Sequence, residues 1–338
     1  MLPSPTTLVL LTLLGYAAAS VSGLVFWRRE KLANHVAFGL GSLASLSGIL
    51  AALSALSGGS SAAAPQLQVL PSLVPYLQFT ARLDPLGMFF VLIVSLLGLA
   101  LSIYYLGYAR SYYGRKNVGA LAAFFNALLL ATTLVFIADN VFFFLIVWEI
   151  MALTAYCLVS FEHEIPETRK AGVLYFIMSH IDAGCIILGF LLLFQASGDY
   201  SFATLHDIGA KMSPGKRDAA FVLFLVGFGI KAGIVPLHIW LPAAHPVAPS
   251  PVSALMSGVL IKTGIYGLTR VCFEFLGPPP SWWGVTVLAI GTISAVLGVL
   301  YALMEHDLKR LLAYHSIENI GIILMGLGAS LMFLHSHH

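Results

Sequence analysis

The sequence predicts an all-α membrane protein, a polytopic bundle of about ten transmembrane helices with a broken seventh helix. Three observations predict this class. Hydrophobic residues make up 59% of the 338 residues and charged residues only 9%, whereas a soluble domain has about 25% charged residues. Apolar stretches of about 20 residues, the length that crosses a bilayer, follow one another along the chain. One of these stretches is interrupted by closely spaced prolines.

The first expected crossing begins at residue 5. The ten expected crossings are 5–27, 35–57, 85–109, 118–138, 140–161, 171–196, 219–245, 251–275, 283–304 and 309–334. The first is longer than a signal-peptide core, and its positive cluster (Arg28, Arg29 and Lys31) follows the apolar run instead of preceding it. We therefore expect a retained membrane helix with the N-terminus outside.

A segment rich in Gly, Ser and Pro, residues 58–84, separates the second and third crossings. Its last part, LQFTARLD, is expected to form a short strand or an interfacial segment ahead of Pro85.

Positive charge differs between alternate loops, and this difference predicts the orientation. The loops on one side hold ten Lys and Arg residues, and the opposite loops hold five, with Arg270 counted among them. Because cytoplasmic loops are enriched in Lys and Arg, the richer side is expected to face the cytoplasm. The segment from Lys211 to Arg217 runs against this rule.

The seventh crossing reads GFGIKAGIVPLHIWLPAAHPVAPSPVSAL. Proline removes an N–H donor and clashes with the preceding turn, so the helix is expected to break a few residues after Lys231, at Pro236 and Pro242. Broken backbone at membrane depth is tolerated only inside protein or beside water. Transporters place such breaks at their ion sites.

Three ionisable residues, Glu149, Lys231 and Lys262, lie about halfway along separate apolar stretches. A charged group at the centre of a bilayer helix costs roughly 2.5–3.5 kcal/mol on insertion scales. We therefore expect these groups to face one another, or water, inside the bundle and to pass charge. Proton or cation movement is the predicted chemistry, and a static ion pair between two helices is the alternative.

Glu149 is the expected counter-charge of Lys231. Burial favours the neutral form of a lysine and a nearby carboxylate favours its charged form, so a lysine under both influences can change charge near neutral pH. Around Lys262, small residues are expected to allow close helix approach and a narrow polar path. These small residues are Ser257, Gly258, Gly264 and Gly267.

Several other polar residues are second-tier candidates for a proton relay: His180, Asp182, His238, His315 and Glu318. His180 and Asp182 are two residues apart and point to nearly opposite sides of one helix. A hydrogen-bonded packing role is an equal alternative for His180. Glu318 follows His315 by three residues and shares its face. His238 and His245 flank the break without a third ligand beside them, so no metal site is predicted.

No catalytic, metal or cofactor site is predicted for this chain. Its three cysteines, Cys157, Cys185 and Cys272, lie in apolar segments, where cysteine is commonly a small buried hydrophobe. The sequence contains no Cys-x-x-Cys pair, dinucleotide-binding glycine motif or phosphate loop. A net charge of +2 without a basic run offers nothing for nucleic acid. Any redox reaction is expected to belong to another subunit.

Three segments resemble a known family: VWEIMALTAYCLV, GFGIKAGIVPLHIWLPAAHPVAPSPVSALMSGVLIKTGIYGL and LYALMEHDLKRLLAYHSIENIGIILMGLG. From about residue 76 onward the chain resembles the proton-pumping antiporter-like membrane family. This family includes large membrane subunits of respiratory NADH–quinone oxidoreductase, of cation/proton antiporters and of membrane-bound hydrogenases. The last segment is most similar to the component B-like membrane subunit of formate hydrogenlyase and hydrogenase-4 complexes.

By this resemblance, Glu149 matches the family's glutamate on helix five, Lys231 its lysine on the broken helix seven, and Lys262 a lysine on helix eight. The implied mechanism is a half-channel in which a proton from the cytoplasmic side rests on Lys231, tuned by Glu149. The proton then moves by way of Lys262 and water toward the membrane centre. The implied partners are other membrane subunits and a peripheral hydrogenase-like redox module, in a bacterial inner membrane.

Family members continue beyond the tenth helix with a release half-channel. The resemblance therefore implies either a fragment or split gene, with a second polypeptide supplying helices 11–14, or an incomplete pump. The resemblance divides the chain into three parts. Residues 1–84 form helices one and two with an external loop, residues 85–275 the uptake half-channel of helices three to eight, and residues 276–338 the start of an incomplete second repeat.

Two other functions remain open from the sequence. One is a sodium/proton antiporter subunit, which sodium-dependent transport would favour. The other is a non-conducting membrane scaffold that anchors a redox module, which co-purification with a hydrogenase in the absence of proton flux would favour.

Overall fold

The computed structural model describes residues 3–57, 65–71 and 78–336, and these residues are mostly helical. The chain forms two compact units. The first contains Met1–Phe161 and Pro249–Val259, and the second contains Glu162–Ala248 and Leu260–His338.

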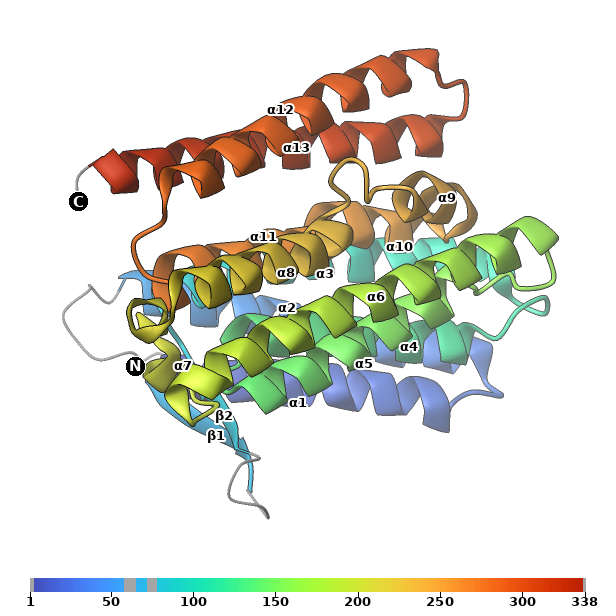
Figure 1. The fold of residues 1–338 in the computed structure, drawn as a ribbon. Coiled ribbons are helices and arrows are strands. Elements are labelled where there is room, and N and C mark those ends of the chain that lie inside the picture. Colours follow the sequence, from blue (N-terminus) through green and yellow to red (C-terminus); the bar gives the residue numbers. More distant parts are fainter. Residues whose placement is uncertain (1–2, 58–64, 72–77, 337–338) are drawn as a thin grey trace. The chain divides into compact units, whose positions relative to one another are not determined.

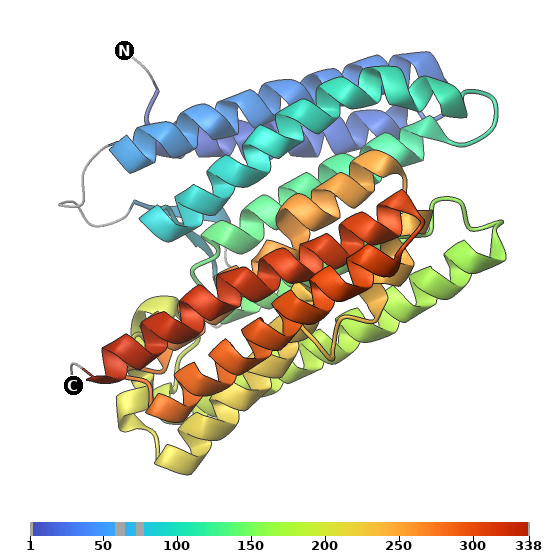
Figure 2. The same ribbon diagram turned by 90° about the horizontal axis from the view of Figure 1, so that it is seen from above.

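Five long helices make up most of the first unit (Figures 1 and 2). They are α1 (Pro5–Val25), α2 (Glu30–Ser57), α3 (Pro85–Tyr108), α4 (Val118–Ile137) and α5 (Val141–Val159). A short helix, α10 (Ser250–Leu255), packs against α3. The helices α3, α4 and α5 each begin after a side chain, Asp84, Asn117 or Asn140, that accepts a hydrogen bond from the first-turn backbone.

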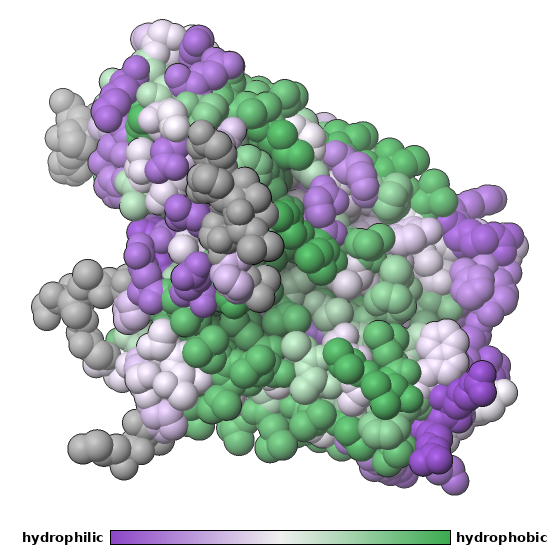
Figure 3. All heavy atoms as spheres, turned by 90° about the horizontal axis from the view of Figure 1, so that it is seen from below, coloured by the Kyte–Doolittle hydropathy of each residue, from purple (hydrophilic) through white to green (hydrophobic). Residues whose placement is uncertain are grey.

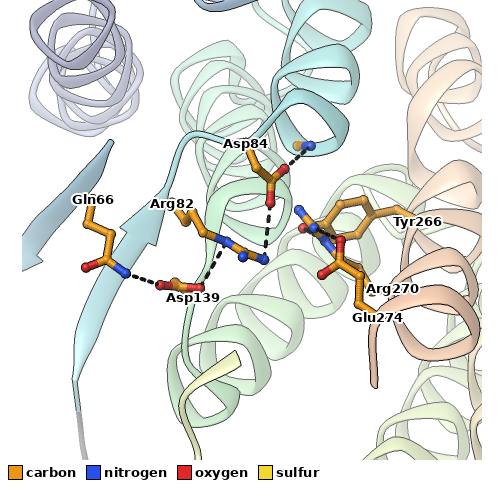
Figure 4. Close-up of polar contacts among 8 residues, drawn as sticks. Gln66, Arg82, Asp84, Asp139, Tyr266, Arg270 and Glu274 are labelled. Carbon is orange, nitrogen blue, oxygen red and sulfur yellow. Dashed lines mark hydrogen bonds and ion pairs between the residues drawn. The ribbon is translucent and has the colours of Figure 1, made fainter. Parts of the chain in front are cut away.

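A two-stranded antiparallel hairpin precedes α3. Strand β1 (Gln66–Leu70) pairs with β2 (Phe79–Arg82), which confirms the strand expected in LQFTARLD. Residues 58–64 and 72–77 of the same predicted segment lie outside the described residues. The Arg82 guanidinium forms ion pairs with Asp84 at 3.3 Å and with Asp139 at 3.2 Å (Figure 4). Gln66 Nε2 donates to Asp139 at 3.1 Å, so the hairpin is fixed to the corner between α4 and α5.

The second unit contains the remaining helices. They are α6 (Pro166–Ser197), α7 (Phe202–Leu205), α8 (Pro214–Ala232), α9 (Trp240–Val247), α11 (Ile261–Arg270), α12 (Ser281–Met304) and α13 (Leu308–Ser336). Helices α12 and α13 lie side by side (Figures 1 and 2). A Cβ added at Gly291 would lie 2.8 Å from the Gly321 carbonyl oxygen, so glycine allows this close approach.

The eighth crossing is one continuous helix, Ser250–Phe275, that contains two π-helical turns. The turns Met256–Leu260 and Val271–Phe275 flank α11 on either side. Because π turns in α-helices occur frequently at functional sites, α11 is a candidate functional segment.

Nine helices in the described part of the chain are long and apolar enough to cross a membrane. On the face that Figure 3 draws, apolar side chains cover the flanks of the helices, and hydrophilic side chains gather toward the helix ends. The seventh expected crossing, residues 219–245, consists of α8 and α9, and α8 is not among the nine because its first turns carry Lys216, Arg217 and Asp218. The predicted class, a polytopic membrane helix bundle, is confirmed.

One charge lies elsewhere than expected. Arg270 is the last residue of α11 and is only 4% exposed, so it is not an external loop residue. The helix continues through the π turn after Arg270, which keeps the side chain inside the bundle. Of the five positive residues counted for the loops on the side predicted to be external, Arg270 is thus removed.

Candidate functional site

The helix that carries Lys231 ends one residue later. Gly233 adopts the left-handed conformation with φ 75°, and its N–H bonds back to two carbonyl oxygens of the preceding turn at 2.9 and 3.1 Å. A regular helix resumes only at Trp240, with Pro236 in the connecting segment and Pro242 in the first turn of α9. The predicted break after Lys231 is confirmed. The residue that ends α8 is Gly233, because glycine adopts this conformation without steric cost.

An aromatic pair closes the end of α8. Trp240 Nε1 donates to the Ile230 carbonyl oxygen at 2.8 Å, which satisfies an acceptor that the break leaves without an intrahelical partner. The Trp240 ring packs edge-on against Tyr175 of α6, with ring centroids 5.2 Å apart. The break is therefore a fixed structure tied to α6.

Lys231 lies directly at this closed end. It is 1% exposed, and its Nζ lies 3.4 Å from the Tyr175 hydroxyl and 5.5 Å from the centre of the Tyr175 ring. The hydroxyl oxygen, the ring face and the negative end of the α8 dipole all favour the charged lysine. Burial favours the neutral form.

One face of α6 is polar and packs against α8. Tyr175, Ser179 and Asp182 follow one another along this face and are 1%, 3% and 1% exposed. A Cβ added at Gly227, one turn before Lys231, would lie 2.8 Å from the Asp182 carbonyl oxygen. Since ionisable residues in membrane helices almost always face other protein groups or water, Asp182 is a candidate counter-charge for Lys231 within the same unit.

Helix α11 also packs closely on α8. A Cβ added at Gly264 would lie 2.4 Å from the Phe228 carbonyl oxygen, and one at Gly267 would lie 2.3 Å from the Phe228 ring. These two glycines therefore make the close helix approach that was predicted around Lys262. Lys262 is half-buried and lies about halfway along the continuous helix Ser250–Phe275.

Glu149 belongs to the first unit. It lies near the middle of α5 and is half-buried, between the buried Trp148 and Ile150, which is 46% exposed. Its predicted pairing with Lys231, in the second unit, stays a prediction.

The second-tier residues differ in their surroundings. His315 Nδ1 and Glu318 Oε2 of α13 are 2.6 Å apart, so the two residues share a face as predicted. His180 is exposed, its ring lies 4.1 Å from that of Phe176, and its Nδ1 lies 2.9 Å from the Phe176 carbonyl oxygen. Asp182 is buried. The two residues thus point to different sides of α6, as predicted.

The two histidines near the break occupy different positions. His238 is half-buried between α8 and α9, and His245 is 2% exposed within α9. Within residues 3–57, 65–71 and 78–336, no three His, Cys, Asp or Glu side chains form a group that could bind a metal ion. Lys309 of α13 donates to the carbonyl oxygens of Pro246 and Ala248 at 3.3 and 2.7 Å, which ties the end of α9 to α13.

A cavity of about 460 Å³ lies beside α9 in the second unit. Four charged residues from the first turns of α6 and the start of α13 contribute to its lining: Glu167, Lys170, Asp307 and Arg310. Apolar residues of α6 and α9 complete the lining. Although most of its lining is apolar, the cavity is large enough to admit water beside the charged groups, next to the broken helix.

Some polar residues of the second unit escaped the sequence analysis. Tyr175 and Trp240 were not singled out, although they hold the end of α8. Arg270 Nε donates to the Tyr266 hydroxyl at 3.1 Å, and its Nη1 pairs with Glu274 (Figure 4). The spacing of four residues within α11 was the signal that predicts these contacts.

The architecture and the site together define a class of protein. A polytopic membrane bundle with a buried lysine at the end of a discontinuous helix is the arrangement that membrane transporters build around ion sites. The chain belongs to the NADH:quinone oxidoreductase/Mrp antiporter transmembrane family, whose model matches residues 138–336.

Curated relatives agree with this assignment. The chain is 44% identical to hydrogenase-4 component B of Escherichia coli (strain K12) over 264 residues, which are 78% of this chain and 39% of the relative. It is 35% identical to formate hydrogenlyase subunit 3 of the same strain over 314 residues, 93% of this chain and 48% of the relative. The chain therefore spans less than half the length of these relatives.

Solved structures share the fold. The chain is similar to a subunit of the archaeal membrane-bound sulfane sulfur reductase, with a TM-score of 0.78, 21% identity and coverage of 98% of this chain and 68% of that one. It is also similar to a chain of the Mrp complex from Dietzia sp. DQ12-45-1b, with a TM-score of 0.78, 24% identity and coverage of 98% and 36%.

Proposed function

We propose that the chain is a proton-translocating membrane subunit of a hydrogenase- or formate hydrogenlyase-type complex, or of a related respiratory complex. The observation that carries the proposal is Lys231, which is 1% exposed at the end of a broken membrane helix, with its Nζ 3.4 Å from Tyr175. The family assignment and the names of the relatives support the type of complex.

In this proposal, a proton from the cytoplasmic side rests on Lys231 and continues to Lys262. The close contact of α8 with α11 at Gly264 supports transfer between the helices that carry these lysines. Glu149 is the proposed carboxylate that tunes Lys231, and Asp182 is a second one, located on the face of α6 that packs against α8. The cavity beside α9 is the proposed approach for the proton.

The proposed setting is a bacterial inner membrane with the N-terminus outside. Other membrane subunits, a peripheral hydrogenase-like redox module and a source for the helices beyond the tenth are the proposed partners. The relatives' greater length supports further helices in the working assembly.

The test compares two variants of the assembled complex in inverted membrane vesicles. Lys231→Ala and Glu149→Gln are expected to lower proton translocation at least about tenfold, equivalent to about 1.4 kcal/mol in the barrier. Hydrogen or formate oxidation should remain partly intact because the redox groups lie in another subunit. A pH-sensitive dye reports translocation, and the redox rate is measured in the same vesicles.

Lys216→Ala is the matched control, since Lys216 lies in the first turn of the same helix and is exposed. The mechanism is wrong if Lys231→Ala and Glu149→Gln, present at the level of the unmodified subunit, generate the same proton gradient as that control.

A sodium/proton antiporter subunit is the second candidate, because the family description includes the Mrp antiporter. Replacing sodium by choline in the same vesicles separates the two ions. Transport that stops without sodium selects the antiporter, whereas transport that continues supports proton translocation. A complex with redox activity and no ion flux at all would select the non-conducting scaffold.

A further inference from the structure

A row of polar side chains runs along the eighth crossing, from its middle to its end. Lys262, Tyr266, Arg270 and Glu274 follow one another at intervals of four residues, about one helical turn, so each is a neighbour of the next and the row winds slowly around the helix. The twelve residues from Lys262 to Glu274 correspond to about 18 Å along the axis. That length is about half the thickness of a bilayer's hydrocarbon core.

Exposure varies along the row. Tyr266 is 0% exposed, the Arg270 side chain 5%, and the Glu274 side chain 25%. The row therefore leads from the lysine at mid-membrane through a buried segment to a carboxylate near the surface. By the orientation predicted from the loop charges, that surface faces outside the cell.

Arg270 is held in place by both of its neighbours in the row. Its Nε donates to the Tyr266 hydroxyl at 3.1 Å, and its guanidinium carbon lies 5.0 Å from the centre of the Tyr266 ring. Its Nη1 pairs with the Glu274 carboxylate (Figure 4). The positive group thus lies on the side of the pair nearer to Lys262, and the negative group lies on the side nearer to the surface.

Proton transfer along a row requires each group both to accept and to donate a proton. A guanidinium has five donors and no acceptor, and it does not lose its proton in proteins. A proton moving along this row therefore meets a group that cannot take it, together with a fixed positive charge that repels it. Channels that exclude protons use a buried arginine in the same physical way.

We propose that Arg270 is an electrostatic barrier that closes the outer side of Lys262 to protons. The proposal rests on the proposed role of Lys262 in proton transfer. The barrier keeps a proton on Lys262 from escaping outward, and external protons from reaching Lys262, along α11. Tyr266 and Glu274 are positioning residues that hold the guanidinium in the row.

The test measures passive proton leak. The assembled complex is reconstituted into liposomes without any electron donor, a potassium diffusion potential is imposed with valinomycin, and an entrapped pH-sensitive dye reports proton flux. Arg270→Gln is expected to raise the leak at least about tenfold, which corresponds to about 1.4 kcal/mol. The double variant Arg270→Gln with Lys262→Ala should return the leak to the original level, because the open route ends at Lys262.

Two further variants separate a barrier from a purely structural ion pair. Arg270→Lys keeps a positive charge, so its proton leak should stay at the level of the unmodified complex. Glu274→Gln removes the ion pair but leaves the guanidinium on the Tyr266 hydroxyl and ring, so its proton leak should be smaller than that of Arg270→Gln. Arg217→Gln is the matched control, since Arg217 of α8 also lies over an aromatic ring, 5.2 Å from the centre of Trp283, but outside the row.

Three results would overturn the proposal. These are an unchanged leak in a folded Arg270→Gln complex, a leak that persists after Lys262→Ala is added, and a leak in Glu274→Gln equal to that in Arg270→Gln. If Arg270→Gln does not assemble, Arg270→Met retains the apolar stem and replaces it under the same criteria. The leak is measured without redox turnover, so failure of the barrier and failure of the proposed pumping by Lys231 are distinguishable.

Discussion

Arg82 in the first unit and Lys231 in the second show two ways of keeping a positive charge in a membrane protein. Arg82 lies at the end of strand β2, its side chain is 23% exposed, and it forms ion pairs with Asp84 and Asp139. Lys231 is 1% exposed, and the contacts around its ammonium include a tyrosine hydroxyl and ring. The first charge fixes a hairpin to the helices, whereas the second is the proposed proton carrier.

The chemistry of the two side chains explains the difference. Arginine stays protonated under all ordinary conditions and binds carboxylates with a rigid set of donors. Lysine is a compact charge whose proton affinity shifts readily on burial. We infer that the arginine site contributes to stability and the lysine site to transfer, and the predictions below test that division.

Replacing Lys231 by arginine should have the largest effect on proton translocation. Lys231→Arg keeps the positive charge but removes the ability to release a proton, so translocation is expected to fall by about a hundredfold, equivalent to about 2.7 kcal/mol. Arg82→Lys keeps a charge near the same carboxylates and should leave translocation nearly unchanged. Vesicle acidification per unit of redox turnover measures both variants. Normal translocation in Lys231→Arg would show that Lys231 only supplies charge.

Removing the Arg82 charge should lower the stability of the protein and leave translocation unchanged. Arg82→Gln leaves Asp84 and Asp139 without this cationic partner, and hydrogen bonds to charged groups contribute about 1.5–3 kcal/mol. We expect the free energy of unfolding to fall by about that amount, measured as a lower thermal midpoint in detergent. Translocation per folded complex should stay the same. A loss of translocation without a loss of stability would contradict the division between the two sites.

The sequence predicted the second site better than the first. Lys231 could be selected from the sequence because a charged residue in an apolar membrane stretch costs insertion free energy. The nearby prolines indicate the helix break that follows it. Arg82 looked like one loop charge among others, because its partner Asp139 is 57 residues away and pairs with it only after the hairpin has folded. A local sequence pattern can predict a helix break, but it cannot predict a contact between segments that are distant in the sequence.

Arg270 shows a second limit of sequence patterns. It was counted as a loop charge because it lies near the end of an expected crossing, yet the π turn Val271–Phe275 prolongs the helix around it. Hydropathy alone does not reveal that its partners, Tyr266 and Glu274, are on the same helix side. The sequence also did not predict that Gly233 ends α8, because the break was assigned to the prolines that follow it.

Packing around the transfer site should be less tolerant than packing elsewhere on the same helices. Gly264→Ala adds a Cβ 2.4 Å from the Phe228 carbonyl oxygen, so α8 and α11 must separate. Overpacking of this kind costs about 1–3 kcal/mol. We expect a lower thermal midpoint together with weaker translocation. Gly184→Ala on α6 is the control, because its Cβ would have nothing within 4 Å. Equal effects of the two substitutions would show that close packing of α11 on α8 is not required.

The smallest expected effect concerns the hydroxyl of Tyr175. Tyr175→Phe removes the oxygen that lies 3.4 Å from Lys231 Nζ but keeps the ring that contacts both Lys231 and Trp240. At 3.4 Å this hydrogen bond is long, so we expect it to contribute only about 0.5–1.5 kcal/mol and translocation to fall several-fold while the complex remains stable. Tyr175→Leu removes the ring as well, and it should also loosen the closed end of α8. A Phe variant as inactive as the Leu variant would mean that the hydroxyl itself relays the proton, and the lysine region would then depend on a chain of groups rather than on one balanced charge.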